Sequence, residues 1–113
     1  MFYELREYTL RPGMRDRWVA LMHYRIVPFQ KRHGMQILGC FTVPENPDAF
    51  VWMRRFDDEA QCANQYEAVY KSAEWLEQIR PQIDEMLIRE LIKVTRLEPT
   101  SNYLGTATLE SSV

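Results

Sequence analysis

The order in which strand-type and helix-type patterns follow one another constrains the fold of this chain more than any other feature. Residues 2–10 alternate aromatic, branched and charged side chains, as a half-buried strand does. Residues 14–33 instead repeat apolar side chains at helical spacing. Two further strand patterns over residues 35–43 and 49–56, a second helical region, and a last strand over residues 88–97 complete the series. The predicted order is β-α-β-β-α-β.

Two residues shape the first helical region. Pro28 lies inside it, and because proline lacks a backbone N–H and crowds the preceding turn, it predicts a kink near residues 24–27. Gly34 follows the last periodic residue and can adopt the left-handed conformation that ends many helices. We therefore expect one kinked helix that stops at residue 33.

The second helical region carries its own start and stop signals. Asp58 is expected to cap the first turn, and Gln61, three residues later, fits a capping box. Ser72 favours a further short helix over residues 75–79, which Arg80-Pro81 is expected to interrupt. This region therefore predicts two helical pieces rather than one.

The predicted order is typical of the α+β, ferredoxin-like fold, in which a four-stranded antiparallel sheet carries its helices on one face. We expect a single domain over residues 1–98, since the 113-residue chain is close to the commonest domain size. Residues 99–113 are rich in Ser and Thr and poor in apolar side chains, which predicts an irregular C-terminal tail.

The sheet is predicted to be apolar on both faces, although helices cover only one. Apolar residues occupy both parities of the two central strands, with Ile37, Phe41 and Val51 on one and Leu38, Phe50 and Trp52 on the other. Aromatic residues make up 12% of the chain, more than a small monomeric core easily hides. A second copy related by a two-fold axis would cover the free face, so we expect a homodimer.

Charge and composition exclude several classes of partner. The formal net charge is −2, and the doublets Lys31-Arg32 and Arg54-Arg55 are too short for a nucleic-acid footprint. The longest uncharged stretch, residues 34–44, is far shorter than the roughly 20 residues of a membrane-spanning helix. We expect neither a nucleic-acid nor a membrane partner.

The cysteines and the N-terminal residues bear on the compartment. Cys40 and Cys62 are the only cysteines, and neither CxxC spacing nor paired histidines accompany them, which argues against a disulfide scaffold and a metal site. Glu4, Arg6 and Glu7 interrupt any apolar signal-peptide core. These features predict a cytoplasmic protein.

Several local strings, taken in order, resemble the NIPSNAP family of the dimeric α+β barrel superfamily. They are YELREYTLRPG at residues 3–13, RHG at 32–34, FVWMRRFDD at 50–58, AEW at 73–75 and IRP at 79–81. The resemblance covers about residues 2–98. It implies a dimer whose two sheets close into a barrel, with pockets between each sheet and its helices.

The resemblance implies no particular reaction, because members of this family mostly lack an established one. Related barrel families include cofactor-free monooxygenases, haem-degrading enzymes and small-molecule isomerases. We expect a NIPSNAP-like homodimeric barrel that binds a small organic molecule between sheet and helices. A cofactor-independent monooxygenase or isomerase and a non-catalytic protein-interaction module are the alternatives.

Polar residues on predicted core-facing positions mark the pocket. Arg25 and His33 fall within the apolar arc of the first helix, and Arg6 shares a strand face with Glu4 and Tyr8. In the functional interpretation, Arg6 or Arg25 binds a carboxylate or enolate and Tyr8 donates a hydrogen bond. In the structural alternative, Arg25 pairs with Glu4 or reaches solvent. His33 then simply ends its helix, where the macrodipole favours it.

Trp52 and Arg54 complete the candidate set from one face of the 49–56 strand. Together they could form an aromatic wall with a cation for a flat ligand. The structural alternative is a cluster in the barrel interior or dimer interface, where Trp and Arg are enriched. No cofactor is expected, because the sequence has no Gly-rich phosphate loop, no metal-ligand spacing and nothing that provides an apolar slot for haem.

Overall fold

The computed structural model describes residues 1–100, and its strands and helices follow the predicted order. The elements are β1 (Phe2–Thr9), α1 (Arg15–Leu21), η1 (Met22–Ile26), α2 (Val27–Arg32), β2 (Gln36–Val43), β3 (Asn46–Phe56), α3 (Glu59–Tyr70), η2 (Trp75–Ile79), α4 (Arg80–Met86), η3 (Arg89–Leu91) and β4 (Lys93–Leu97). The turns η1 and η2 are π-helical, and η3 is a 3-10 turn. The tail predicted over residues 99–113 lies almost wholly outside the described residues.

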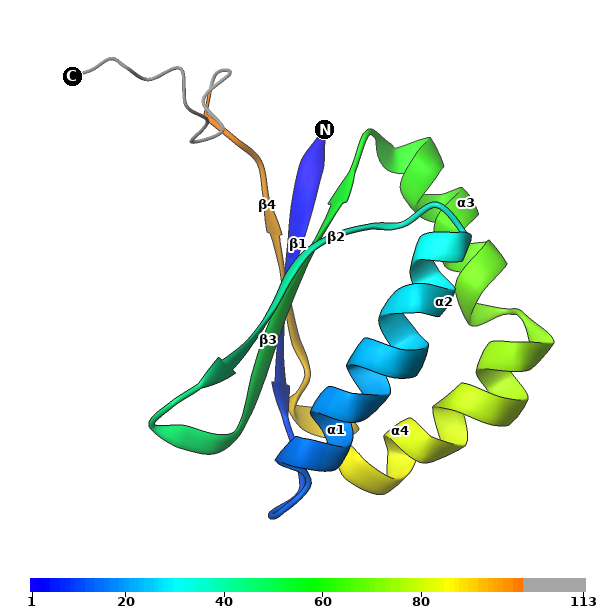
Figure 1. Cartoon of the computed structure of the whole chain (residues 1–113). Coiled ribbons are helices and arrows are strands. Elements are labelled where there is room, and N and C mark those ends of the chain that lie inside the picture. Colours follow the sequence, from blue (N-terminus) through cyan, green and yellow to red (C-terminus); the bar gives the residue numbers. More distant parts are fainter. Residues whose placement is uncertain (101–113) are drawn as a thin grey trace.

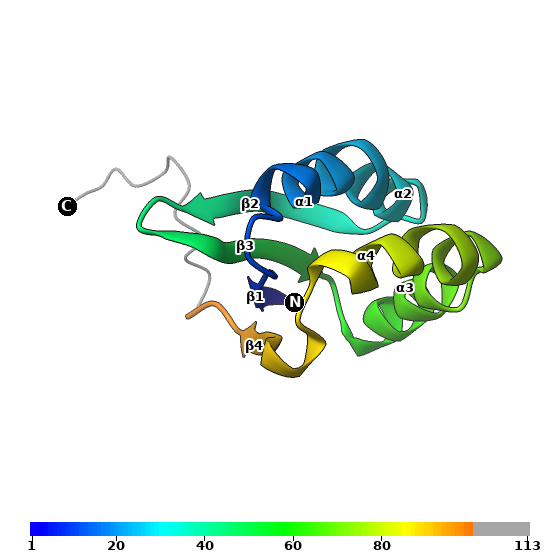
Figure 2. The ribbon, with the colours of Figure 1, turned by 90° about the horizontal axis from the view of Figure 1, so that it is seen from below.

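The four strands form one antiparallel sheet in the order β2-β3-β1-β4. All helices pack against one face of this sheet, as the two perpendicular views show (Figures 1 and 2). The α+β, ferredoxin-like architecture is thereby confirmed. In the central β1–β3 pair, Glu4 lies opposite Arg54 and Arg6 lies opposite Trp52. This register brings the polar residues of two distant segments together beneath the helices.

Each helical region contains a proline that is preceded by a π-helical turn. The residue just before Pro28, Val27, donates its N–H to the carbonyl of Met22 five residues back, and Arg80, just before Pro81, bonds to Trp75 in the same way. A proline lacks an N–H and crowds the turn before it, and the wider π turn accommodates both defects. The kink predicted near residues 24–27 coincides with the π turn η1.

Three predicted boundaries are wrong. Pro81 does not interrupt the second helical region, because the π turn η2 accommodates the proline and the helix continues through α4 to Met86. The last strand covers only Lys93–Leu97, since residues 89–91 form the turn η3 instead of continuing the alternation. Strand β3 begins at Asn46, three residues earlier than expected, because the hairpin loop is shorter.

The predicted cap residues behave as expected. The Asp58 side chain accepts a hydrogen bond from the Gln61 N–H at the start of α3, and the Gln61 side chain accepts from the Asp57 N–H. Ser72 Oγ accepts from the Trp75 N–H at the start of the next helical piece. Gly34 ends α2 with φ of +89°, in the left-handed region.

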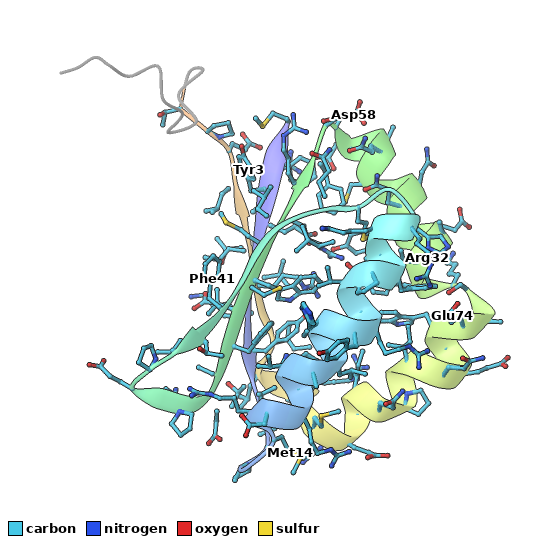
Figure 3. All side chains as sticks on the ribbon, in the orientation of Figure 1. Tyr3, Met14, Arg32, Phe41, Asp58 and Glu74 are labelled. Carbon is cyan, nitrogen blue, oxygen red and sulfur yellow. The ribbon has the colours of Figure 1, made fainter. Side chains whose placement is uncertain are left out.

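The sheet face without helices has an apolar centre, as predicted, but Ile37 is not part of it. A register shift between Ile37 and Gly39 places Ile37 opposite Arg54 on the helix-covered face instead of with Phe41 and Val51. Val51 and Met53 alternate with side chains that are buried under the helices, so they lie on the opposite face. Phe41 pairs with Val51 and remains 54% exposed, and its side chain stands on the helix-free side of the sheet together with Tyr3 (Figure 3). No residue of the described chain covers this face.

Candidate functional site

A cavity of about 300 Å³ lies between the sheet and the two helical segments, α1–α2 and α3–α4. Six aromatic side chains form most of its wall, and they are Tyr8, Trp18, Trp52, Tyr66, Tyr70 and Trp75. The three tryptophans of the chain are all among them. Apolar side chains of η1 and α4 complete the wall, and Arg80 and Arg89 lie at the solvent side, where Asp84 pairs with both. A volume of this size accommodates a small organic molecule.

A buried guanidinium supports the floor of the cavity. The Arg54 side chain has no exposed surface, and its Nη2 donates to Glu4 Oε1 at 2.7 Å and to Tyr66 Oη at 3.0 Å. Its Nη1 donates to Tyr70 Oη at 2.7 Å and to Gln30 Oε1 at 2.9 Å. Burying a charge is costly unless it is paired and hydrogen-bonded, so this set of partners is what allows Arg54 to occupy the core.

A second guanidinium, from Arg6, shares the same carboxylate but faces the cavity. Arg6 Nη1 lies 3.3 Å from Glu4 Oε1 and 3.2 Å from Tyr66 Oη, and Nε donates to Tyr8 Oη at 2.9 Å. Glu4 is the only carboxylate within 4 Å of either guanidinium in the described chain. The cluster therefore holds two positive charges and one negative charge, and the unmatched positive charge belongs to the residue that lines the cavity.

The ionisation states of the cluster follow from these contacts. Burial alone would raise the pKa of Glu4, but the charge of Arg54 and the hydrogen bond from Tyr66 outweigh it and hold that pKa below its usual value. Burial raises the pKa of Tyr66, and its hydrogen bond to Glu4 keeps it raised despite the charge of Arg54. At neutral pH Glu4 is ionised and the Tyr66 hydroxyl is protonated.

The hydroxyl groups around the cavity are oriented by this network. Tyr66 donates its hydrogen to Glu4 Oε2. Tyr70 Oη accepts from Arg54 and from Gln30 Nε2, and Gln30 is fixed in this orientation because its carbonyl must face the Arg54 cation. Tyr8 Oη likewise accepts from Arg6. The hydroxyl hydrogens of Tyr8 and Tyr70 have no acceptor among the described residues, so both remain free to donate into the cavity.

Two indole nitrogens near the cavity lack partners. The Nε1 atoms of Trp18 and Trp52 are buried and have no hydrogen-bond acceptor within residues 1–100, and they are not exposed to the cavity. No carboxylate or imidazole lines the cavity in the part of the chain that the structure describes. The polar groups that can reach a ligand are therefore led by the Arg6 guanidinium and the Tyr8 and Tyr70 hydroxyls, whose free hydrogens suit a ligand with acceptor oxygens.

A second hollow, of about 340 Å³, lies between the first helix and the edge strand β2. Its lining is mostly apolar, and its polar members are His23, Cys40 and Thr42. None of these side chains makes a hydrogen bond to another side chain in the described chain. The first cavity, with its fixed network, is the better candidate for specific recognition.

Residues 3–101 match the family model of NIPSNAP, which is almost the whole length of the chain. The chain belongs to the NIPSNAP family. No curated protein matches it at a significant level.

Solved structures agree with this assignment. A NIPSNAP domain protein from Burkholderia xenovorans is 20% identical, with a TM-score of 0.80 over 92% of this chain and 99% of its own. A NIPSNAP family protein of unknown function from Agrobacterium tumefaciens is 21% identical, with a TM-score of 0.80 over 91% of each chain. A putative antibiotic biosynthesis monooxygenase from Nitrosomonas europaea shares the fold more distantly, at 11% identity and a TM-score of 0.67 over 89% of this chain and 100% of its own. These likenesses establish the fold alone.

The structure of this NIPSNAP chain brings together four of the six residues that the sequence singled out. Arg6, Tyr8 and Trp52 line the cavity, and Arg54 lies directly beneath it with its guanidinium 4.9 Å from the Trp52 ring centre. Among residues 1–100, no cluster of His, Cys, Asp or Glu is arranged to hold a metal ion. No helix in that part of the chain is long and apolar enough to cross a membrane.

The other two candidates lie outside the cavity. The expectation that Arg25 faces the core is wrong, because its side chain is 40% exposed and lies 3.7 Å from the Glu74 carboxylate on the outer surface. The π turn η1 changes the helical phase, so a projection at 3.6 residues per turn misplaces it. His33 contacts the Phe29 carbonyl through Nδ1 at 3.0 Å, at the end of α2. Glu4 pairs with Arg54 and Arg6 instead of Arg25.

Three residues of the network were missed as functional residues by sequence reasoning. The helical spacing of Tyr66 and Tyr70 indicates core packing, which is true of their rings but says nothing of the hydrogen bonds that their hydroxyl groups make. Gln30 is fully buried although it falls outside the predicted apolar arc, so the sequence offered no signal for it.

The Arg54–Glu4 contact can be tested by a double-mutant cycle. Glu4→Gln leaves the buried Arg54 charge without a carboxylate, and it is expected to lower the free energy of unfolding by about 3–5 kcal/mol. Arg54→Met should cost less, because Glu4 keeps Arg6 as a partner. The double variant should lose less than the sum of the single losses, because no unpaired charge remains at these two positions. Urea unfolding followed by circular dichroism measures all four species. Additive losses would show that the two side chains are not coupled.

The lowered pKa of Glu4 predicts a specific pH dependence. Because the folded-state pKa lies below the ordinary value of 4.5, the unfolded chain binds more protons in this range. The stabilisation from Glu4 is therefore complete above about pH 4.5 and is lost as the pH falls through the folded-state pKa. The stability gap between the unmodified protein and Glu4→Gln should narrow over that range. Glu67→Gln, at a carboxylate that is 69% exposed, is the control. A gap that is independent of pH would contradict the assignment.

Proposed function

We propose that this NIPSNAP protein binds a small, planar organic molecule that carries an anionic or electron-rich oxygen. The observation that carries the proposal is the unmatched positive charge of Arg6 at the wall of a cavity whose other polar groups are donors. A cation that is largely removed from water is stabilised by an opposite charge, and a ligand anion can supply it. The aromatic walls favour a flat molecule, which can stack on them or meet them edge to face.

The cavity bears differently on the two alternative functions that the sequence left open. A protein-interaction module predicts no pocket, so the cavity favours small-molecule binding. A cofactor-independent monooxygenase or isomerase is the second candidate, because donors aimed at one oxygen stabilise an enolate. Among the described residues, however, the cavity lining has no carboxylate or imidazole that could remove a proton. Because the described lining supplies no general base, a phenol that stays protonated in the cavity should show no oxygen uptake.

Intrinsic fluorescence offers a direct test of binding, because all three tryptophans line the cavity. We expect 2-naphthol to change the tryptophan emission in a saturable way, and 2-naphthylmethylamine, a cation of similar size, to have little effect. Arg6→Met should weaken binding of 2-naphthol by about tenfold or more, since it removes a charge-assisted hydrogen bond. Arg17→Met, at an exposed arginine of α1, is the matched control. Equal binding of the cation, or an unchanged affinity in Arg6→Met, would rule out the proposal.

We also propose that two copies of the chain pair through the helix-free sheet face. Half-buried Val51 and Met53 and exposed Phe41 would otherwise leave an apolar surface in water. Sedimentation should give twice the 13.5 kDa chain mass, and Met53→Lys should shift the protein toward the single-chain mass. Leu76→Lys, at an exposed apolar residue of η2, should leave the mass unchanged. An unmodified protein that sediments as a single chain at micromolar concentration would refute the pairing.

A further inference from the structure

The Arg6 guanidinium has only one nitrogen left for a ligand. Its Nε is bonded to Tyr8 Oη, and its Nη1 is bonded to Glu4 and Tyr66. The remaining Nη2 makes no hydrogen bond within the described residues and is not enclosed by protein. A carboxylate is gripped best when two guanidinium nitrogens face its two oxygens. The Arg6 guanidinium can present two such pairs of nitrogens, Nε with Nη2 and Nη1 with Nη2. One nitrogen of each pair is already hydrogen-bonded to protein, so neither pair can bind both oxygens of a carboxylate.

A single oxygen, by contrast, finds two donors at this position. Nε and Nη2 share one edge of the planar guanidinium, and Tyr8 Oη already occupies the Nε half of that edge. An oxygen bound at the Nη2 half therefore lies next to the Tyr8 hydroxyl. Since that hydroxyl accepts from Arg6, its hydrogen is free to donate to the bound oxygen. The two donors converge on one acceptor atom.

The charges around this point favour an ionised oxygen. The ionisable side chains that line the cavity are Arg6, Tyr8, Tyr66, Tyr70, Arg80 and Arg89. The nearby Glu4 carboxylate is offset by Arg54, which belongs to the same network. A ligand oxygen at Arg6 therefore meets the unmatched positive charge of Arg6 directly. A second unmatched positive charge lies at the solvent side, where Arg80 and Arg89 share Asp84, and no unmatched negative charge lies among the described lining residues. An opposite charge at contact distance favours the charged form of an acid.

We propose that the cavity selects planar phenols and enols over carboxylates and holds them as single-oxygen anions against Arg6 and Tyr8. The proposal rests on the proposed function and narrows it to one chemical class. The ring of such a ligand would lie among the indole rings of Trp18, Trp52 and Trp75, in a volume of about 300 Å³. That volume suits a ligand of one or two rings.

The test uses 4-nitrophenol, whose phenolate absorbs visible light and which ionises near neutral pH. Its apparent pKa is measured by titration with the full-length protein in excess, and its affinity is compared with that of 4-nitrobenzoate by tryptophan quenching. We expect the pKa of the bound phenol to fall by about one unit or more, which corresponds to a tenfold or greater preference for the phenolate. We expect 4-nitrobenzoate to bind more weakly than the phenolate.

Two variants test whether the Arg6 guanidinium and the Tyr8 hydroxyl cause the pKa shift of the bound phenol. Arg6→Met should abolish the pKa shift of the bound phenol, and Tyr8→Phe, which removes only a hydroxyl and retains the ring, should reduce it. If Arg6→Met fails to fold, the pKa shift measured with Tyr8→Phe alone tests the proposal. Arg17→Met, on the outer surface, should retain the full shift.

The results of these experiments distinguish the proposed selection of phenolates from the broader proposal of small-molecule binding. Binding of 4-nitrophenol with an unchanged or raised pKa overturns the proposal but leaves small-molecule binding in place. Equal or tighter binding of 4-nitrobenzoate also overturns it, because the cavity would then recognise two-oxygen anions. If 4-nitrophenol does not bind while 2-naphthol does, the proposal falls alone. If neither binds, the proposed function falls with it.

Discussion

The burial of the Arg54 guanidinium is the constraint on which the rest of this structure depends. A fully buried charge must be paired and hydrogen-bonded, and the four partner side chains come from three elements of the chain. Glu4 belongs to the neighbouring strand β1, Gln30 to α2, and Tyr66 and Tyr70 to α3. The same contacts that neutralise Arg54 therefore join both helical segments to the sheet. Stability and site geometry have a common origin here.

The arrangement of hydrogen bonds in this network determines what the cavity can recognise. Because Arg54 is a donor at every nitrogen that has a partner, the groups around it must present lone pairs inward and hydrogens outward. Tyr70 accepts a hydrogen bond from Arg54, and Tyr8 accepts one from Arg6. Both hydroxyl groups consequently direct their hydrogens away from the network. A core cation thus produces a cavity lined with donors. Such a lining favours acceptors over donors in a ligand, and a negative charge over a positive one.

The sequence predicted the element order and the covered and uncovered sheet faces, because periodicity and turn residues are local signals. It predicted Arg6, Tyr8, Trp52 and Arg54 as a group, since polar residues on a core-facing strand are conspicuous. It could not place Arg25, because the π turn before Pro28 changes the helical phase. Nor could it pair Glu4 with Arg54, which are 50 residues apart and meet only through the strand register. Contacts of that kind depend on tertiary structure.

The most direct test of the account is a crystal structure of the protein soaked with 4-bromophenol, in which anomalous scattering locates the bromine. We expect a bromine atom inside the cavity between the indole rings, with the phenol oxygen within hydrogen-bond distance of Arg6 Nη2 and Tyr8 Oη. A cavity filled only by solvent, or a phenol whose oxygen contacts Arg80 or Arg89 at the solvent side instead of Arg6, would contradict it.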